Sequence, residues 1–443
     1  MHIGIDFGTT NSGAAWLAGQ EVHMFSLDPA AGDPTVMPSI LYITREHEIL
    51  VGKEAIDTYY QQNIGRPSKK VRQYVGEIEQ TFAEVGTFIK DVYVMVDELL
   101  PGRLLRSLKS GLATGYQGTT IFGKQYTLEE LVSIYLRRIK ERVEAEAGQP
   151  VQGVVLGRPV HFVGDSAQNQ LAEDRLRRAA HMAGFREIAF ELEPVAAALH
   201  YERMIDHAQH IVVFDFGGGT LDITVMRVGG SPDDRKVFAT GGIGIAGDVF
   251  DQRIVQNVLL EHFGRGSLWG EEKDVFPNSY TDALTNWQTV LELNQPDTLR
   301  FLQLAQLTGS NPARVRALES LLINNYAVRM FDEVERAKIA LSDARFATIT
   351  LSGEDIAIWQ PVTRSQFEAM IARETQRIEK CLLDTLHRSG LRADQIDAVV
   401  RTGGSSQIPC FIEMLGRIFD PQKVRLSSVF GGVTAGLAVR AAT

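Results

Sequence analysis

Two segments of the chain place an aspartate, glycines and hydroxyl side chains in the same order. In IGIDFGTTNSG, residues 3–13, an apolar run ends at Asp6 and is followed by Phe-Gly, two threonines and an asparagine. In HIVVFDFGGGTLDITVMRVGG, residues 210–230, an apolar run ends at Asp215 and is followed by Phe-Gly, two more glycines and Thr220. Glycine lets a backbone turn sharply and approach a ligand, and the N–H groups of such a turn, with threonine hydroxyls, can bind an anion. Each segment therefore predicts a phosphate-binding loop between two strands.

The aspartates near these loops require a cation. A carboxylate repels a bare phosphate, so Asp6, Asp215 and Asp222 fit the site only if a divalent cation lies between them and the phosphates. Mg²⁺ keeps several waters when it binds a protein and is often held through few carboxylates. One such loop alone could be an ordinary tight hairpin, but two copies with matching flanks favour a phosphate site. We expect two facing loops that hold a nucleoside triphosphate and its hydrated metal ion in a cleft between related halves.

Strands and helices must alternate to position these loops. Three short apolar strands are separated by helical patterns, as in α/β proteins: VQGVVLG (151–157), EIAFELE (187–193) and HIVVFDFG (210–217). Thr127 and Glu130 form a capping box ahead of one apolar helical face. Asp165 with Gln168 has the pattern of the next N-cap, and Gly184 marks the end of that helix.

The charge pattern argues against a general nucleic-acid binder. The 443 residues suffice for two or more domains, and their formal net charge is −10, whereas phosphate contacts need clustered Lys and Arg. The basic segment YLRRIKERVEAEAG mixes both signs at helical spacing, which indicates a solvated helix face. The segment RPSKKVRQ, residues 66–73, indicates a loop followed by the start of a helix.

Cysteine usage and hydropathy indicate a cytoplasmic protein. The two cysteines, Cys381 and Cys410, lie in separate apolar segments that suggest neither a disulfide framework nor a zinc site, and the histidines show no ligand spacing. The first residues enter a strand without the pattern of a signal peptide, and no uncharged apolar run approaches the length of a membrane span. We expect no membrane and no nucleic acid among the partners.

The chain resembles a known family well beyond its two loops. The segments that carry the resemblance follow the family order: YTLEELVSIYLRRIKERVEAEAGQPVQGVVLGRPVHF, AAHMAGFREIAFELEPVAAALHY, GIAGDVFDQRIV, VERAKIALS, RTGGSSQIP and FGGVTAGLAVRAA. With the loops, they are similar to the nucleotide-binding domain of the seventy-kilodalton heat-shock chaperones, within the actin-like ATPase superfamily. The resemblance implies an α/β actin-like ATPase fold, in which two related lobes with ribonuclease H-like cores surround a central nucleotide cleft. It also implies ATP or ADP with Mg²⁺ as cofactors.

The resemblance assigns roles to the loop residues. The residues that hold the phosphates from one side would be Gly8, Thr9, Thr10 and Asn11. Those that hold them from the other side would be Gly217, Gly218, Gly219 and Thr220. Asp6 and Asp215 would bind waters of the Mg²⁺, with Asp222 in support. Asp6, Asp215 and Thr220 are also counted among the catalytic candidates.

Two more catalytic candidates lie outside the loops. Glu193 precedes Pro194, which suits a first helical turn. It could be a surface carboxylate at a helix start, but the resemblance places it at the metal and the attacking water. The family also has a lysine beside the terminal phosphate, where it stabilises charge in the transition state. The matching segment, RSLKSGLATG, makes this lysine Lys109, with a solvated surface lysine as the alternative.

The resemblance also locates an adenosine site. Glu335 and Lys338 would contact the ribose and Ser342 the base, while the backbone of Gly403 and Gly404 would approach from the other side. The rest of the predicted nucleotide-binding set is Gly247, Ile339, Ser405 and Gln407.

The chain departs from the family at three positions near this site. Ile339 and Gln407 stand where it usually has arginines, and Phe430 stands where it has an aspartate. The loss of two guanidinium groups removes stacking and charge, although Ile339 and Phe430 could still offer an apolar sandwich to the base. The departures concern adenine selectivity and leave the phosphate site intact.

The resemblance divides the chain into two lobes. Residues 1–205 form the first, with phosphate loop 1; residues 206–443 form the second, with phosphate loop 2, the adenosine site, a helical insertion of about 264–325 and a last helix that returns to the first lobe. Residues 45–105 also fall outside the visible resemblance, and VGTFIKDVYVMVDELLPGR within them alternates like a strand. The chain stops just after the last family motif, so we expect no peptide-binding domain.

Three functions are compatible with this fold. The first is a slow ATPase of the chaperone branch, in which ATP contacts both lobes, favours closure of the cleft and acts on an unknown protein partner. The second is a small-molecule kinase, which needs a carboxylate base that we cannot assign. The third is a filament-forming actin relative. The long chaperone-like segments favour the first.

Overall fold

The computed structural model describes residues 1–66, 70–82, 86–160, 166–230, 234–426 and 431–443. They form two compact units. Unit 1 comprises Met1–Thr58, Arg103–Phe250 and Glu368–Thr443, and unit 2 comprises Tyr59–Gly102 and Asp251–Phe367. The boundaries of these units do not coincide with those of the predicted lobes, residues 1–205 and 206–443, and the two lobes stay a prediction. Both expected phosphate loops belong to unit 1.

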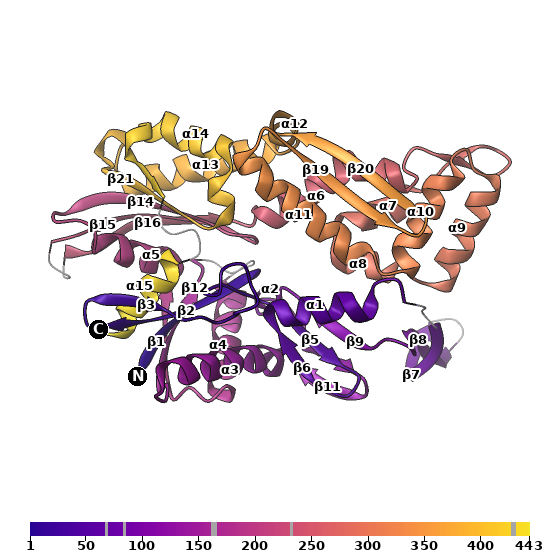
Figure 1. The fold of residues 1–443 in the computed structure, drawn as a ribbon, viewed down its shortest axis with the longest axis horizontal. Helices are drawn as coiled ribbons and strands as arrows, with labels where there is room; N and C mark the ends of the chain where they lie inside the picture. The colour runs from indigo at the N-terminus through magenta and orange to yellow at the C-terminus, as the bar shows by residue number, and fades with distance from the viewer. Residues whose placement is uncertain (67–69, 83–85, 161–165, 231–233, 427–430) are drawn as a thin grey trace. The chain divides into compact units, whose positions relative to one another are not determined.

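The first sheet of unit 1 has the strand order β13-β12-β1-β2-β3, and the short strand β4 (Met37–Pro38) also pairs with β2 (Figure 1). Its main strands are β1 (His2–Phe7), β2 (Asn11–Ala18), β3 (Glu21–Met24), β12 (Gly153–Arg158) and β13 (Glu187–Leu192). β1 pairs antiparallel with β2 and parallel with β12, whereas β2–β3 is antiparallel and β12–β13 is parallel. The strands predicted at 151–157 and 187–193 are confirmed.

The second sheet of unit 1 repeats this topology. Its order is β16-β15-β14-β21-β22, with strands β14 (Gln209–Phe216), β15 (Leu221–Val228), β16 (Lys236–Ile243), β21 (Ala398–Thr402) and β22 (Val424–Leu426). β14 pairs antiparallel with β15 and parallel with β21, while β15–β16 is antiparallel and β21–β22 is parallel. β14 therefore occupies the position in its sheet that β1 occupies in the first, which agrees with the two Asp-Phe-Gly segments.

Helices cover these sheets and connect their cores. The helices of unit 1 include α2 (Leu108–Gly111), α3 (Leu128–Ala147), α4 (Ser166–Met182), α5 (Glu193–Glu202), α13 (Ala372–Ser389), α14 (Pro409–Phe419) and α15 (Gly432–Ala441). Helix α6 (Gly247–Ile254) begins in unit 1 and ends in unit 2. One buried apolar cluster joins Val155 of β12 and Val213 of β14 to Ala197 of α5 and Leu437 of α15. The two sheets therefore share a core through α5 and α15.

The last helix, α15, lies directly on the backbone of its neighbours. A Cβ atom on Gly436 would come within 1.6 Å of the Ala196 carbonyl oxygen, and one on Gly4 within 2.3 Å of the Ala438 nitrogen. No side chain fits at these two glycines, so α15 packs closely on α5 and β1.

The capping box predicted at the start of α3 is confirmed. The Glu130 N–H donates to the Thr127 Oγ1 at 3.2 Å, and the Thr127 N–H donates to the Glu130 Oε2 at 2.7 Å. The apolar face of α3, including Leu131 and Tyr135, is buried. Gly184, with φ of +93°, follows the end of α4 as predicted. The N-cap predicted at Asp165 lies outside the described residues.

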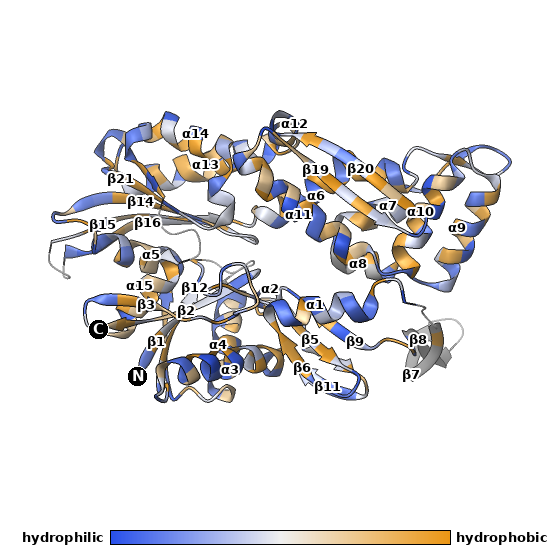
Figure 2. Cartoon of the chain, viewed as in Figure 1, coloured by the Kyte–Doolittle hydropathy of each residue, from blue (hydrophilic) through white to orange (hydrophobic). Residues whose placement is uncertain are grey.

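Among the described residues, unit 2 contains three antiparallel strand pairs and several helices. The pairs are β7 (Lys70–Phe82) with β8 (Gly86–Asp97), the short β17 (Leu268–Trp269) with β18 (Asp274–Val275), and β19 (Phe346–Gly353) with β20 (Ile356–Thr363). The helices include α7 (Asn278–Asp282), α8 (Trp287–Glu292), α9 (Pro296–Thr308), α10 (Pro312–Ile323) and α11 (Ala327–Asp343). Figure 2 shows hydrophobic and hydrophilic residues alternating along β19 and β20, which matches their alternating burial. None of the described helices combines the length and apolar composition that a membrane span requires.

One local prediction in unit 2 is wrong and a neighbouring one is confirmed. The segment 66–73 does not lead into a helix, because β7 begins at Lys70. The basic residues suggested a helix start, but the pairing of β7 with β8 supplies backbone hydrogen bonds that the charge pattern could not reveal. The strand predicted within residues 85–103 is β8.

Candidate active site

Each expected phosphate loop is the turn of a hairpin that follows an aspartate. In the first sheet, Asp6 of β1 stands opposite Gly13 of β2. In the second, Asp215 of β14 stands opposite Asp222 of β15. Both aspartates therefore lie near the end of the first strand of their hairpin, and a short polar turn follows.

The structure brings these two turns together. An ideal Cβ atom on Gly218 would come within 2.5 Å of the Thr10 Oγ1, and one on Gly219 within 3.4 Å of the Thr9 Oγ1. In contrast, a Cβ on Gly217 would have no atom within 4 Å. The threonine hydroxyls of one loop therefore face the glycine backbone of the other, and open space remains beside Gly217.

Hydrogen bonds from other segments to the backbone carbonyl groups of Gly217 and Gly218 hold the second loop in place. The Gly217 carbonyl oxygen accepts hydrogen bonds from the Gly247 N–H at 3.3 Å and the Ser405 hydroxyl at 2.7 Å. The Gly218 carbonyl oxygen accepts one from the Asp248 N–H at 2.8 Å. Residues far apart in sequence thus fix this loop, including the predicted Gly247 and Ser405.

The segment 403–407 lies directly against the second loop. Gly403 has φ of +81°, and a Cβ there would come within 2.3 Å of the Phe216 carbonyl oxygen. Only glycine fits this position without strain. Gly404 and Gln407 bound the short 3₁₀ turn that follows, and both are half-buried. The two predicted glycines therefore stand where a backbone approaches loop 2, whereas Phe430 lies outside the described residues.

The first loop is fixed from the segment around β4. The Ser39 N–H donates to the Thr10 carbonyl oxygen, and the Ser39 hydroxyl donates to the Gly8 carbonyl oxygen, both at 2.8 Å. A Cβ on Gly8 would come within 2.1 Å of the Asn11 carbonyl oxygen, so the turn requires glycine there. Asn11 begins β2 and pairs with Pro38.

Burial and neighbouring carboxylates raise the pKa values of the aspartates near the two loops. Burial, reinforced by the negative charge of Glu193, raises the pKa of Asp6 to about 7 despite the nearby Lys109. Burial, Glu193, Asp222 and Asp6 raise the pKa of Asp215 well above its usual value. The structure therefore places the predicted metal-site aspartates in one electrostatic cluster with Glu193.

Asp222 is the most enclosed of these aspartates. It is 2% exposed, and its carboxylate accepts hydrogen bonds from the Val160 N–H and the Thr220 hydroxyl, both at 3.1 Å. Burial and the charge of Glu193 raise the pKa of Asp222 to about 7, although these two hydrogen bonds act in the opposite direction. Thr220 is thus oriented by Asp222.

Lys109 is buried and paired with Glu193. Its Nζ lies 2.6 Å from the Glu193 Oε1, and the two residues are each 8% exposed. Burial lowers the pKa of Lys109, but the charges of Glu193, Asp6 and Asp215 together raise it above its usual value, so the ammonium stays charged. The alternatives of a solvated surface lysine and a surface glutamate are therefore wrong for this pair.

The charge balance of this cluster suits a bound cation. Four acidic residues, Asp6, Glu193, Asp215 and Asp222, face one ammonium group, and burial followed by mutual repulsion raises the pKa values of the three aspartates. No group of three or more His, Cys, Asp or Glu among the described residues is arranged to ligate a metal ion directly. The arrangement is therefore compatible with a cation held through water, as expected for Mg²⁺.

The remaining adenosine candidates lie on α11 of unit 2. Lys338 is 9% exposed, and its Nζ forms an ion pair of 2.6 Å with the Asp251 carboxylate. Ile339 is 59% exposed, Glu335 and Ser342 are half-buried, and the Ser342 carbonyl oxygen accepts a hydrogen bond from Arg364. All four residues belong to unit 2, as do Asp251 and Arg364, the partners named for them.

Sequence reasoning missed residues that support the loops. Ser39 fixes loop 1, and Asp248 follows Gly247 within GIAGDVFDQRIV, a segment that had already been singled out. Ser39 gave no signal, because a lone serine after a proline has no pattern of its own. Arg175, in RLRRAA, is buried, although such basic clusters usually indicate a solvated helix face.

Comparisons with known proteins agree with this geometry. The model of one protein family, described as "Hsp70 protein", matches residues 2–274 and 321–443. It extends over residues 45–105, which we had expected to lie outside the resemblance, and it leaves residues 275–320 unmatched. The fold is therefore the α/β actin-like ATPase fold that this family has.

Similar curated proteins include "Chaperone protein DnaK" from Thermotoga neapolitana, Thermotoga petrophila and Thermotoga maritima. Each is 25% identical to this chain over 451 residues, which cover 99% of this chain and 59% of the relative. The chain thus spans about three fifths of the length of the relatives it matches.

Proposed function

Because the chain belongs to the Hsp70 family, we propose that it binds ATP with Mg²⁺ and hydrolyses it slowly to ADP and phosphate. The observation that carries this proposal is the meeting of the two glycine-rich loops beside a buried lysine and four carboxylates. Glycine turns bind phosphate through backbone N–H groups, while the carboxylates call for a cation among the phosphates.

The proposed roles of the binding residues are those that the resemblance to the family implies. Loop 1, with Gly8, Thr9, Thr10 and Asn11, would hold the phosphates from one side. Loop 2, with Gly217, Gly218, Gly219 and Thr220, would hold them from the other. Asp6, Asp215 and Asp222 would hold Mg²⁺ through water, and the ion, when bound, would neutralise negative charge on the phosphates. Gly247, Gly403, Gly404, Ser405, Gln407, Glu335, Lys338, Ile339 and Ser342 would complete the nucleotide site.

Lys109 and Glu193 would act on the reaction itself. The Lys109 ammonium would stabilise the negative charge that develops on the transferred phosphoryl group. Glu193 would orient the attacking water by accepting its hydrogen bond. Their ion pair of 2.6 Å supports this assignment, because it holds the two side chains together beside Asp6 and Asp215.

We further propose a chaperone-type role in the cytoplasm. The similar relatives are named as chaperone proteins, and ATP held by both loops at once would favour closure of the two predicted lobes. Hydrolysis would weaken that connection, and a protein partner would respond to the change. A reducing cytoplasm agrees with Cys381 and Cys410, which are both free thiols.

The test measures ATP binding and single-turnover hydrolysis of the wild-type protein and of Lys109→Ala. We expect wild type to release inorganic phosphate, and the variant to lose roughly 100-fold to 1,000-fold in rate while still binding ATP. The control is Lys124→Ala, an exposed lysine outside the cluster. Transfer of the phosphoryl group to a small molecule would favour a kinase, and an unchanged rate in Lys109→Ala would contradict the assignment.

A further inference from the structure

Lys109 belongs to α2, a helix that is too short to be stable by itself. α2 has four residues, and its N-cap residue Ser107 adopts the left-handed φ of +56° without donating or accepting a side-chain cap. A single helical turn fixes several backbone dihedral angles but forms very few hydrogen bonds, so it is unstable in isolation. The buried side chains of Leu108 and Leu112 anchor the turn in the core, but apolar contacts do not fix the direction of the backbone.

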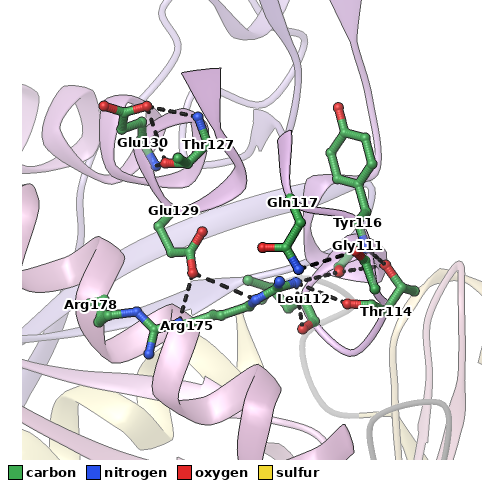
Figure 3. Close-up of polar contacts among 11 residues, drawn as sticks. Gly111, Leu112, Thr114, Tyr116, Gln117, Thr127, Glu129, Glu130, Arg175 and Arg178 are labelled. Atoms are coloured by element: carbon green, nitrogen blue, oxygen red, sulfur yellow. Dashed lines mark hydrogen bonds and ion pairs between the residues drawn. The ribbon is translucent and has the colours of Figure 1, made fainter. Parts of the chain in front are cut away.

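Arg175 of α4 adds side-chain hydrogen bonds at the other end of the turn, where the backbone bonds are those from Leu112 to Lys109 and from Thr114 to Gly111. Its Nη1 donates to the carbonyl oxygens of Gly111 and Leu112, each at 3.4 Å, and of Thr114 at 3.0 Å (Figure 3). Gly111 is the last residue of α2, and Leu112 and Thr114 follow it, so these carbonyl groups lie at or just beyond the C-terminal end of the helix. The Gly111 carbonyl oxygen also accepts hydrogen bonds from the Thr114 N–H at 3.1 Å and the Thr114 hydroxyl at 2.9 Å. One guanidinium group therefore binds the backbone of the whole segment that follows Lys109.

Glu129 holds Arg175 in turn. The Arg175 Nε lies 3.6 Å from the Glu129 Oε1, and Arg178 donates to the same oxygen at 2.7 Å (Figure 3). Burial would raise the pKa of Glu129, but the hydrogen bond from Arg178 and the charge of Arg175 lower it below its usual value. Glu129 lies in the first turn of α3, next to the capping box, so its own backbone is fixed.

The burial of Arg175 makes this arrangement specific. The residue is 3% exposed, and a guanidinium group cannot lose its charge inside a protein. A buried charge is costly unless it is paired and hydrogen-bonded, and an apolar side chain would fill the same space at lower cost. The Arg175 Nη1 has three carbonyl partners, whereas the Nε has the ion-pair contact with Glu129 but no hydrogen bond among the described residues. The presence of arginine at position 175 is therefore explained by its hydrogen bonds to the backbone of residues 111–114.

We propose that Arg175 is a positioning residue for the lysine of the active site: its guanidinium fixes the turn 111–114 and thereby the place of the Lys109 ammonium. The proposal rests on the proposed role of Lys109 in hydrolysis. Since Arg175 acts through Lys109, it affects the rate of hydrolysis and not the affinity for ATP.

The test compares Arg175→Met with Arg178→Met in the full chain. Methionine keeps an unbranched side chain but removes all donors to the carbonyl groups. Arg178 shares Glu129 with Arg175, yet its side chain is 55% exposed and it has no hydrogen bond to the turn among the contacts of the described residues. We expect Arg175→Met to lower the single-turnover rate about tenfold or more, because small displacements of a reacting group are costly, and to leave the dissociation constant of ATP within about threefold. Arg178→Met should change neither quantity.

A double variant separates positioning from general stability. In Lys109→Ala, the further change Arg175→Met should cause no additional loss of rate, because the group that it positions is absent. The proposal would be overturned if the loss of rate in the double variant equals the product of the two single losses. A wild-type rate in Arg175→Met would overturn it as well. If Lys109→Ala itself keeps the wild-type rate, the proposed function of Lys109 fails first.

A second substitution covers the case in which Arg175→Met does not fold. Arg175→Lys keeps a positive charge, but its single nitrogen cannot both donate to the three carbonyl groups, as the Arg175 Nη1 does, and contact Glu129, as the Arg175 Nε does. We expect it to fold and to show a reduced hydrolysis rate with unchanged ATP affinity. A wild-type rate in Arg175→Lys would overturn the proposal.

Discussion

The Lys109–Glu193 ion pair is the centre of the cluster at the scale of single residues. It is buried, and Asp6, Asp215 and Asp222 add negative charge around it. Removing one partner of a buried ion pair leaves an uncompensated charge, which costs about 3–5 kcal/mol in other proteins. Without Lys109, four carboxylates would face each other, so the lysine also supports the folded state.

The raised pKa values of the aspartates predict a specific dependence of stability on pH. An acid whose pKa is higher in the folded than in the unfolded state binds its proton more tightly when folded, so its contribution to stability is lost as pH rises through the folded pKa. For Asp222 that loss falls between its usual value of 3.8 and about 7. Asp222→Asn keeps the shape of the neutral acid and cannot ionise.

We therefore expect the melting temperature of nucleotide-free Asp222→Asn, relative to wild type, to rise as the pH increases from 5 to 8. Thermal unfolding at several pH values measures this difference. A difference that stays constant across this range, or that shifts toward wild type at high pH, would show that Asp222 is ordinarily ionised in the folded protein.

Sequence reasoning found most of the cluster residues but not their support. Asp6 and Asp215 were identified because they recur at equivalent positions of a repeated pattern, and Asp222 because it is a carboxylate directly after the second loop. Lys109 was identified only through the resemblance, and its burial could not be predicted because it comes from packing of α2 among distant elements. Arg175 had no usable signal, since its partners are backbone carbonyl groups of residues 111–114.

At the scale of elements, the contact of the two hairpin turns decides where phosphates could lie. A Cβ on Gly218 would collide with the Thr10 hydroxyl, whereas one on Gly217 would enter open space. The two neighbouring glycines thus have different reasons to lack a side chain. Gly218 allows the loops to meet, and the proposed function assigns the space beside Gly217 to a phosphate.

These differences predict two distinct phenotypes. We expect Gly218→Ala to lower the melting temperature of the nucleotide-free protein by several degrees, because about 1–3 kcal/mol is typical for overpacking. Gly217→Ala should leave that temperature unchanged and yet weaken ATP binding. Thermal unfolding with and without Mg-ATP measures both effects. Normal ATP affinity in Gly217→Ala would contradict the placement of a phosphate beside this residue.

Elements with strong local patterns were predicted, and elements that depend on distant partners were not. The capping box at Thr127 and the apolar strands contain their own signals, and the structure confirms them. The segment 66–73 was interpreted from its charge alone, whereas its strand forms by pairing with residues 86–97. The outcome at that segment shows a tertiary contact overriding a local preference.

At the scale of the whole molecule, duplication organises the chain. Two sheets of the same topology place an aspartate at the end of their first strands, and α5 and α15 join their cores. The repeat was visible in the sequence because both copies retain Asp-Phe-Gly. The compact units could not be predicted in this way, because each is assembled from separate stretches of chain. The unmatched residues 275–320 are largely helical and belong to unit 2.

The most direct test of the central claim is equilibrium binding of three ligands to the wild-type protein: ATP with Mg²⁺, ATP with a chelator, and AMP with Mg²⁺. If both loops hold a metal-bridged polyphosphate, ATP with Mg²⁺ binds at least about tenfold more tightly than either of the others, a difference of about 1.4 kcal/mol or more. Equal affinity for AMP and ATP, or no effect of removing Mg²⁺, would contradict the account.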